Sequence, residues 1–203
     1  FPTRRSSDLI GLEMGIDLRF KSEINQFIDS APFDFVIASV HEIGDIEVYD
    51  GTEFYLQKIK EEAQREYLLA CLDVVQNFEN YNSFGHLDYV ARYGPYTDKS
   101  IKFAENREIL FEILRALASK EKALEINTRL FDDPKTEQFY SDLLINFKKL
   151  GGKFITLGTD SHIAKRDWLS IHKARTLIKK AGFHELATFS GMKIDKNKKS
   201  IKE

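Results

Sequence analysis

The chain contains 203 residues, of which 42% are hydrophobic and 31% are charged, a composition typical of a soluble globular domain with a sizeable core. Its 30 basic and 32 acidic residues give a net charge of −2, so no overall positive field favours nucleic acid or an anionic membrane. The single cysteine, Cys71, excludes an intrachain disulfide and indicates a reducing, cytoplasmic setting, and no apolar run approaches the roughly 18 residues of a membrane span.

The first nine residues, FPTRRSSDL, are polar and lack a hydrophobic pattern, whereas the sequence turns abruptly apolar at Ile10. We interpret residues 1–9 as a non-native or disordered segment that resembles sequencing-adapter read-through. A genuine polar tail is the alternative. The first interpretation implies that the native N-terminus of the domain is missing, so this segment takes no part in the fold prediction.

Short apolar runs alternate with longer helical patterns over the rest of the chain. Runs rich in β-branched and aromatic residues predict strands at 10–17, 33–40, 83–90, 122–128, 153–160 and 184–190. Apolar residues at helical spacing predict helices at 21–30, 52–78, 98–118, 135–149 and 166–181. Glycines follow the last two of these helices, as expected where a helix ends.

This alternation predicts an α/β domain with a parallel sheet covered by helices. No low-complexity linker divides the chain, so we expect one domain over 10–190 and a frayed, Lys-rich tail over 191–203. In parallel α/β folds, functional side chains follow the carboxyl ends of the strands and meet at one mouth. The polar residues at such positions are His41, His86, Asn127, Asp160 and His162.

Histidine and carboxylate side chains together are typical ligands of Zn, Mn or Fe. Glu13 lies inside an apolar strand, where a carboxylate is costly unless it is paired or bound to a metal. Asp160 and His162 are two residues apart, as are His86 and Asp88, and such pairs share one side of an extended chain. Each residue alone is more often a surface or capping group, but together they favour a metal site. The two remaining histidines are interpreted as structural or surface residues.

Five motifs are similar, in order and spacing, to those of a known enzyme family. They are GLEMGID, FDFVIASVHEI, SFGHLDYVARYGPY, LEINTRLF and LGGKFITLGTDSHIAKRDW, and they cover most of residues 10–190. The set resembles the polymerase and histidinol phosphatase superfamily of metal-dependent phosphoesterases, and within it the histidinol-phosphatase branch. The resemblance implies a distorted seven-stranded, TIM-like β/α barrel whose mouth holds up to three divalent transition-metal ions, with Zn, Mn or Fe as candidates.

The resemblance also assigns the metal ligands. It implies that Glu13 bridges two metals, that His41 and His86 bind the second metal, and that Asp160 and His162 bind the first and the third. The family begins with an HxH pair on its first strand, and no HxH occurs in this sequence. We therefore expect the barrel of this chain to lack its first strand or strands and its first and third metal sites to be incomplete.

The reaction implied by the resemblance is hydrolysis of the small molecule L-histidinol phosphate to L-histidinol and phosphate, a step of histidine biosynthesis. Glu13, Asp160 and Arg92 are the implied catalytic residues. Arg92 suits bidentate phosphate binding, and Arg129 and Asn127 complete the candidate substrate contacts. The alternative for either arginine is a surface ion pair.

Two other functions stay open. The first is a phosphoesterase of the same superfamily that acts on another small phosphate or on a nucleic-acid end, although nucleic-acid binding needs a basic track. The second is an inactive metal-binding barrel fragment, which the missing HxH pair favours. Lys165 and Arg166 are two more cations after the predicted site, and we interpret them as the solvated start of a helix. The sequence does not indicate an oligomeric state.

Overall fold

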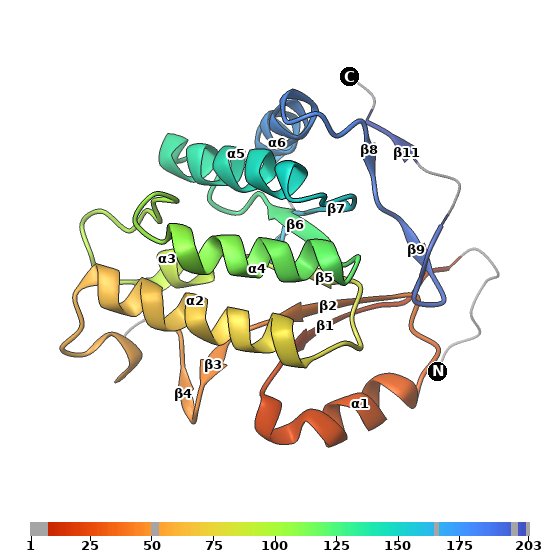
Figure 1. Ribbon diagram of the computed structural model, residues 1–203, viewed down its shortest axis with the longest axis horizontal. Coiled ribbons are helices and arrows are strands. Elements are labelled where there is room, and N and C mark those ends of the chain that lie inside the picture. Colours follow the sequence, from red (N-terminus) through yellow and green to blue (C-terminus); the bar gives the residue numbers. More distant parts are fainter. Residues whose placement is uncertain (1–7, 50–52, 165–166, 196–198, 202–203) are drawn as a thin grey trace.

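The fold is an α/β structure built on a sheet of five parallel strands (Figure 1). The computed structural model describes residues 8–49, 53–164, 167–195 and 199–201. The strands lie in the order β1-β2-β5-β6-β7, with bounds Gly11–Gly15, Phe35–Ser39, Ser83–Phe84, Ala123–Asn127 and Ile155–Gly158. Each strand is added on the same side of its predecessor and parallel to it. This one-directional winding is that of a β/α barrel, which confirms the predicted fold class.

Helices cover the outside of this sheet. Those in the described part of the chain are α1 (Lys21–Asp29), α2 (Lys60–Asn77), α3 (Tyr89–Tyr93), α4 (Arg107–Ser119), α5 (Pro134–Lys149) and α6 (Trp168–Lys180). Figure 1 shows α2, α4, α5 and α6 side by side along one face of the sheet. Their apolar sides supply much of the core, which includes the fully buried side chains of Tyr67, Leu110, Ile113, Tyr140 and Phe147.

The ends of α5 and α6 follow local sequence signals. Asp133 and Asp167 cap the two helices, because their carboxylates accept hydrogen bonds from the backbone N–H groups of Lys135 and Ser170. Gly151 and Gly182 follow the helices with φ of +87°, a conformation that glycine adopts without steric cost. The predicted helix ends here are therefore confirmed. Arg166, where the second helix was expected to begin, lies outside the described residues.

Three predicted elements are wrong in extent. The first long helix begins at Lys60, after a 3-10 turn at Glu53–Tyr55. The second long helix begins at Arg107. Residues 98–106 form an irregular segment, and the spacing of its buried residues resembles that of a helix. The strand expected over 83–90 covers two residues only, since the chain turns at His86 with φ of +21° and enters α3.

Short strands follow the main elements. The predicted strand over 184–190 is two strands, β8 (Glu185–Leu186) and β9 (Phe189–Ser190), which pair antiparallel with β11 (Lys199–Ser200) and β10 (Lys193–Ile194). The described parts of the Lys-rich tail are thus paired rather than frayed. A hairpin of β3 (Glu42–Ile43) and β4 (Ile46–Glu47), which was not predicted, follows β2.

None of the described helices is both long and apolar enough to cross a bilayer.

Cys71 lies fully buried in α2, and burial raises the pKa of its thiol to about 12 from an ordinary value of 9.0. We expect the native protein to react with a thiol-specific reagent at pH 8 at least about 10³-fold more slowly than the unfolded chain, since the thiolate fraction falls tenfold for each pKa unit. Labelling rates in buffer and in denaturant measure this ratio. Fast labelling of protein with native circular dichroism would contradict the burial of Cys71.

Candidate metal centre

Three predicted ligands converge at the carboxyl ends of neighbouring strands. Glu13 lies in β1, His41 follows β2 and His86 follows β5. His86 Nε2 lies 2.8 Å from Glu13 Oε1, His41 Nε2 lies 3.4 Å from the same oxygen, and the two Nε2 atoms lie 3.3 Å apart. Parallel strands therefore bring together residues that are far apart in the sequence.

This cluster has the chemistry of a cation site. Hydrogen bonds from His41 and then His86 hold the pKa of Glu13 far below its ordinary value, so its carboxylate is ionised at neutral pH. Two imidazole nitrogens and one carboxylate oxygen, all within 4.8 Å of one another, form a donor set that suits Zn and related ions. The ring of Tyr89 packs against both imidazoles, with centroids 4.8 Å from His41 and 5.1 Å from His86, and fixes their orientation.

Glu125, which the sequence analysis missed, positions His86. This buried β6 carboxylate accepts the backbone N–H of His86 at Oε2, at 2.9 Å, and the Nδ2–H of Asn127 at the same oxygen, at 3.3 Å. Burial raises the pKa of Glu125. Its hydrogen bond supports the positive φ of His86, which is uncommon for a residue other than glycine. The signal that identified Glu13, an acid inside an apolar strand, also applies to Glu125.

Two glycines lie close to the Glu125 carboxylate. A Cβ atom on Gly158 would lie 2.1 Å from Glu125 Oε1, and a Cβ on Gly85 would lie 3.4 Å from Oε2 and 2.8 Å from a methyl group of Ile37. The 2.1 Å distance from the Gly158 Cβ to Glu125 and the 2.8 Å distance from the Gly85 Cβ to Ile37 are both shorter than van der Waals contact. Glycine is thus required at position 158 in β7, because a side chain there would displace the acid that holds His86, whereas a side chain on Gly85 would clash with Ile37.

A second group of predicted residues gathers around Asp160. Asp160 follows β7 with φ of +46°, and its Oδ2 contacts Arg92 Nη1. Arg129 Nη1 donates to the backbone carbonyl of Asp160 at 3.1 Å and lies 3.6 Å from its Oδ1. His162 Nδ1 lies 2.9 Å from Arg129 Nη1, and the His162 side chain is exposed. The structure therefore pairs Asp160 with two arginines.

One cavity of about 370 Å³ joins the two groups. Its lining consists of Glu13, Gly15, His41, Tyr49, Tyr89, Arg92, Tyr93, Arg129, Asp160 and His162. Two predicted residues lie behind its wall. His86 is buried and reaches the site through Nε2, whereas Asn127 is buried and bonds to the N–H of Arg129 and to Glu125. Asn127 thus contacts the residues that support the site. Lys165 and Arg166 lie outside the described residues.

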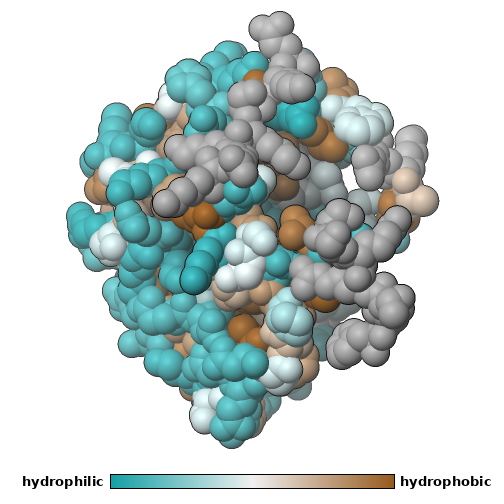
Figure 2. All heavy atoms as spheres, turned by 90° about the vertical axis from the view of Figure 1, so that its right-hand side faces the viewer, coloured by the Kyte–Doolittle hydropathy of each residue, from teal (hydrophilic) through white to brown (hydrophobic). Residues whose placement is uncertain are grey.

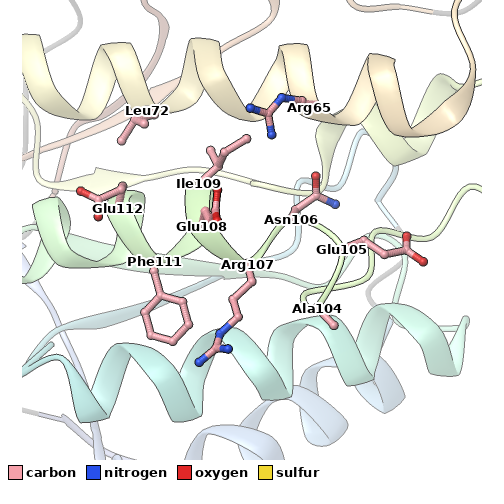
Figure 3. Close-up of a pocket in the computed structure, with 10 residues that line it drawn as sticks. All are labelled: Arg65, Leu72, Ala104, Glu105, Asn106, Arg107, Glu108, Ile109, Phe111 and Glu112. Carbon is pink, nitrogen blue, oxygen red and sulfur yellow. The ribbon is translucent and has the colours of Figure 1, made fainter.

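Two larger clefts lack such convergence. The cleft between α2 and residues 104–112, of about 910 Å³, appears in Figure 3, where Arg65 points from α2 toward Ile109 while Arg107 and Phe111 point toward α5. The other cleft, of about 1,070 Å³, lies between the ends of the sheet and the β8–β9 segment. Figure 2 shows that face of the molecule, where hydrophobic residues occur in small groups among hydrophilic ones. The lining of neither cleft contains a histidine.

The sequence of this chain is similar to those of known proteins. A family model described as PHP domain matches residues 7–129. The chain is 30% identical over 159 residues to a probable histidinol-phosphatase of Clostridium acetobutylicum, a match that covers 78% of this chain and 62% of that protein. It is 32% identical over 154 residues to a probable histidinol-phosphatase of Thermotoga maritima, covering 71% and 63% respectively. The chain therefore spans less than two-thirds of the length of these relatives.

A solved structure is also similar. It is the crystal structure of histidinol phosphate phosphatase from Lactococcus lactis subsp. lactis in complex with zinc, L-histidinol and phosphate. The two chains are 98% identical and superpose with a TM-score of 0.92, which covers 93% of this chain and 72% of that one. Since the family model alone matches more than half of the sequence, the chain belongs to the PHP domain family.

Proposed function

We propose that this chain forms the metal-dependent phosphomonoesterase part of a histidinol-phosphatase, which hydrolyses L-histidinol phosphate to L-histidinol and phosphate in histidine biosynthesis. The observation that carries the proposal is one cavity in which Glu13 and His41 face Arg92 and Arg129. A phosphate monoester requires this combination of a cation site and charged donors. The names of the two relatives and the ligands of the neighbouring crystal structure support the same substrate.

Glu13, His41 and His86 hold one divalent ion in this proposal, and Asp160 and His162 contribute to further sites, up to three in all. Zinc is favoured because the neighbouring crystal structure contains it, while the ligand types also accommodate Mn and Fe. A bound ion of this kind would supply Lewis-acid chemistry, which polarises the phosphoryl group and lowers the pKa of water so that hydroxide is available to attack phosphorus near neutral pH.

Arg92 and Arg129 bind the phosphoryl oxygens. Both guanidinium groups contact Asp160 in the structure, so a phosphate and Asp160 compete for the same donors. If Asp160 held a metal ion, the two arginines would be available to the substrate. Tyr49 and Tyr93 line the same cavity, and their rings pack against each other with centroids 4.4 Å apart.

The second candidate function is an inactive metal-binding fragment, favoured by the absence of an HxH pair from the sequence. A different small phosphate is the other alternative for the same site. A nucleic-acid end is disfavoured by the net charge of −2. The single, buried cysteine is consistent with a reducing compartment, so we propose that the reaction takes place in the cytoplasm.

The direct test compares phosphate release from L-histidinol phosphate, from another small phosphomonoester and from phosphorylated single-stranded DNA. We expect turnover of L-histidinol phosphate that a chelator abolishes and added zinc restores. Binding of zinc without turnover of any substrate would instead support the inactive fragment. Faster release from DNA would overturn the small-molecule assignment.

Arg92→Ala is expected to raise the Michaelis constant for L-histidinol phosphate by about 10–100-fold, because a hydrogen bond between charged groups contributes roughly 1.5–3 kcal/mol. Steady-state kinetics at saturating zinc measures this change. Arg115→Ala is the matched control, since the exposed Arg115 pairs with Glu112 on the outside of α4. Equal Michaelis constants for the two variants would remove Arg92 from the substrate site.

A further inference from the structure

A chain of buried polar groups runs from the cavity wall into the core. It begins at Asp160, passes through Arg92 in α3 to Asp88 immediately before that helix, and ends at Tyr140 in α5. The side chain of Arg92 is 3% exposed and that of Asp88 is 2% exposed. Tyr140 is fully buried. Nothing in the proposed reaction assigns a role to Asp88 or Tyr140.

The contacts orient Asp88 toward Arg92. The Tyr140 hydroxyl donates to Asp88 Oδ1 at 2.7 Å, and Arg92 Nη2 lies 3.8 Å from the same oxygen. Within the described residues, Asp88 Oδ2 and the Nε and Nη2 atoms of Arg92 have no hydrogen-bond partner. Asp88 thus has an acceptor oxygen without a hydrogen bond, and Arg92 has donor groups without one, at ion-pair distance from each other. A small rotation of either side chain would allow two parallel hydrogen bonds between them.

A capping role does not account for Asp88. It occupies the position before α3, but its side chain makes no capping hydrogen bond. Its carboxylate points instead into the core, where an acid is costly unless its charge is balanced. The balancing charge is the guanidinium of Arg92, and Tyr140 supplies a second stabilising contact.

Arg92 needs a permanent counter-charge for the same reason. Burial alone would lower the pKa of Arg92, but the nearby carboxylates of Asp88 and Asp160 outweigh burial and raise it. Asp160 cannot supply the negative charge that balances Arg92 at every stage of the proposed reaction if it also binds a metal ion. Asp88 lies away from the lining of the cavity, so its charge stays beside Arg92 when Asp160 is engaged elsewhere.

We infer that Asp88 is a positioning residue, held by Tyr140, which keeps the Arg92 guanidinium at the cavity wall and aimed at the phosphoryl group when Asp160 binds metal. This inference rests on the proposed function, because it requires a phosphate in the cavity. It adds two residues, from α5 and from the start of α3, that act on the reaction only through Arg92.

A double-mutant cycle on the zinc-loaded protein tests the inference, with inorganic phosphate as the probe and calorimetry as the readout. Asp88→Asn keeps the shape of the side chain and removes its charge. We expect it to weaken phosphate binding about 10–100-fold and to raise the Michaelis constant more than it lowers kcat. In an Arg92→Ala background the same substitution is expected to change phosphate binding by less than about twofold.

Two further variants exclude a merely structural effect. Tyr140→Phe removes only the hydroxyl and is expected to weaken phosphate binding about 3–10-fold, which provides a second measurement if Asp88→Asn does not fold. Asp34→Asn is the control, because Asp34 is a buried acid that accepts the backbone N–H groups of Ile10 and Gly191. It is expected to lower stability while leaving phosphate affinity within about twofold. Zinc content should be unchanged in all three variants.

The outcomes separate this inference from the proposed function. Equal losses of phosphate affinity on Asp88→Asn with and without Arg92, or no loss at all, would overturn the positioning role even if the wild type hydrolyses L-histidinol phosphate. A loss that depends on Arg92 supports the role even if L-histidinol phosphate is not turned over. A wild type that binds zinc but no phosphate overturns both.

Discussion

Glu13→Gln is expected to lower zinc affinity by more than about 100-fold, which exceeds the usual effect of removing a group that only supports a metal ligand. The substitution keeps the size of the side chain but removes the charge that lies 2.8 Å from His86 Nε2 and 3.4 Å from His41 Nε2. Two neutral imidazoles and an amide are a poor ligand set for a divalent ion. Calorimetric titration of the chelator-treated protein with zinc measures the affinity, and hydrolysis of phosphate monoesters should fall with it.

The pH dependence of zinc binding is a second test of the charge on Glu13. Because the pKa of Glu13 is held far below its ordinary value, this carboxylate stays ionised at any pH above the ordinary range of glutamate. We therefore expect protonation of Glu13 to contribute nothing to any loss of zinc between about pH 5 and pH 8, because this range lies above the ordinary glutamate pKa of about 4.3. Retention of wild-type zinc affinity by Glu13→Gln would exclude Glu13 as a ligand.

The sequence predicts the parts of the site that depend on topology alone. Alternating strand and helix patterns indicate a parallel sheet, and such a sheet places the residues that follow its strands at one edge. His41 and His86 can be grouped on that basis without any coordinates, whereas Glu13, which lies inside its strand, stands out as a carboxylate in an apolar run. Asp160 and Arg92 share the cavity for the same reason, although their direct pairing depends on side-chain packing.

The remaining features depend on which side chains pack together across the fold. Glu125 is identified as a support for His86 only when β6 is placed between β5 and β7, and the hydrogen bond that holds Asp88 in the core appears only when α5 brings Tyr140 against it. The prediction of an extended chain through Asp88 failed because His86 adopts a positive φ, which no local pattern signals.

The error in the second long helix has a similar cause. Ile101 and Phe103 are buried, so they continue the apolar periodicity that α4 shows further on. Both residues belong to an irregular segment, which Gln64 stabilises by donating hydrogen bonds to the carbonyls of Lys99 and Ser100. Periodicity reports which residues are buried, and burial does not require a helix.

Gly158→Ala is expected to disturb both the fold and the metal centre by displacing Glu125. The new Cβ would lie 2.1 Å from Glu125 Oε1 and 2.9 Å from its carboxyl carbon, so the acid has to move. We expect the free energy of unfolding to fall by about 1–3 kcal/mol, as for other overpacked sites. Zinc affinity should fall as well, because the displaced carboxylate releases the backbone N–H of His86. Denaturant titration and zinc calorimetry measure the two effects.

Two comparisons isolate the cause of this effect. Gly11→Ala adds the same methyl group to β1, where the nearest atom would lie 3.8 Å away, and it should change stability and zinc affinity little. In the double variant Gly158→Ala with Glu125→Ala, the clash is absent, so the combined loss of stability should be smaller than the sum of the two single losses. Additive losses would mean that Gly158 acts independently of Glu125. A loss below the sum would establish that the glycine is required by the carboxylate, and through it by the backbone conformation that directs His86 toward Glu13.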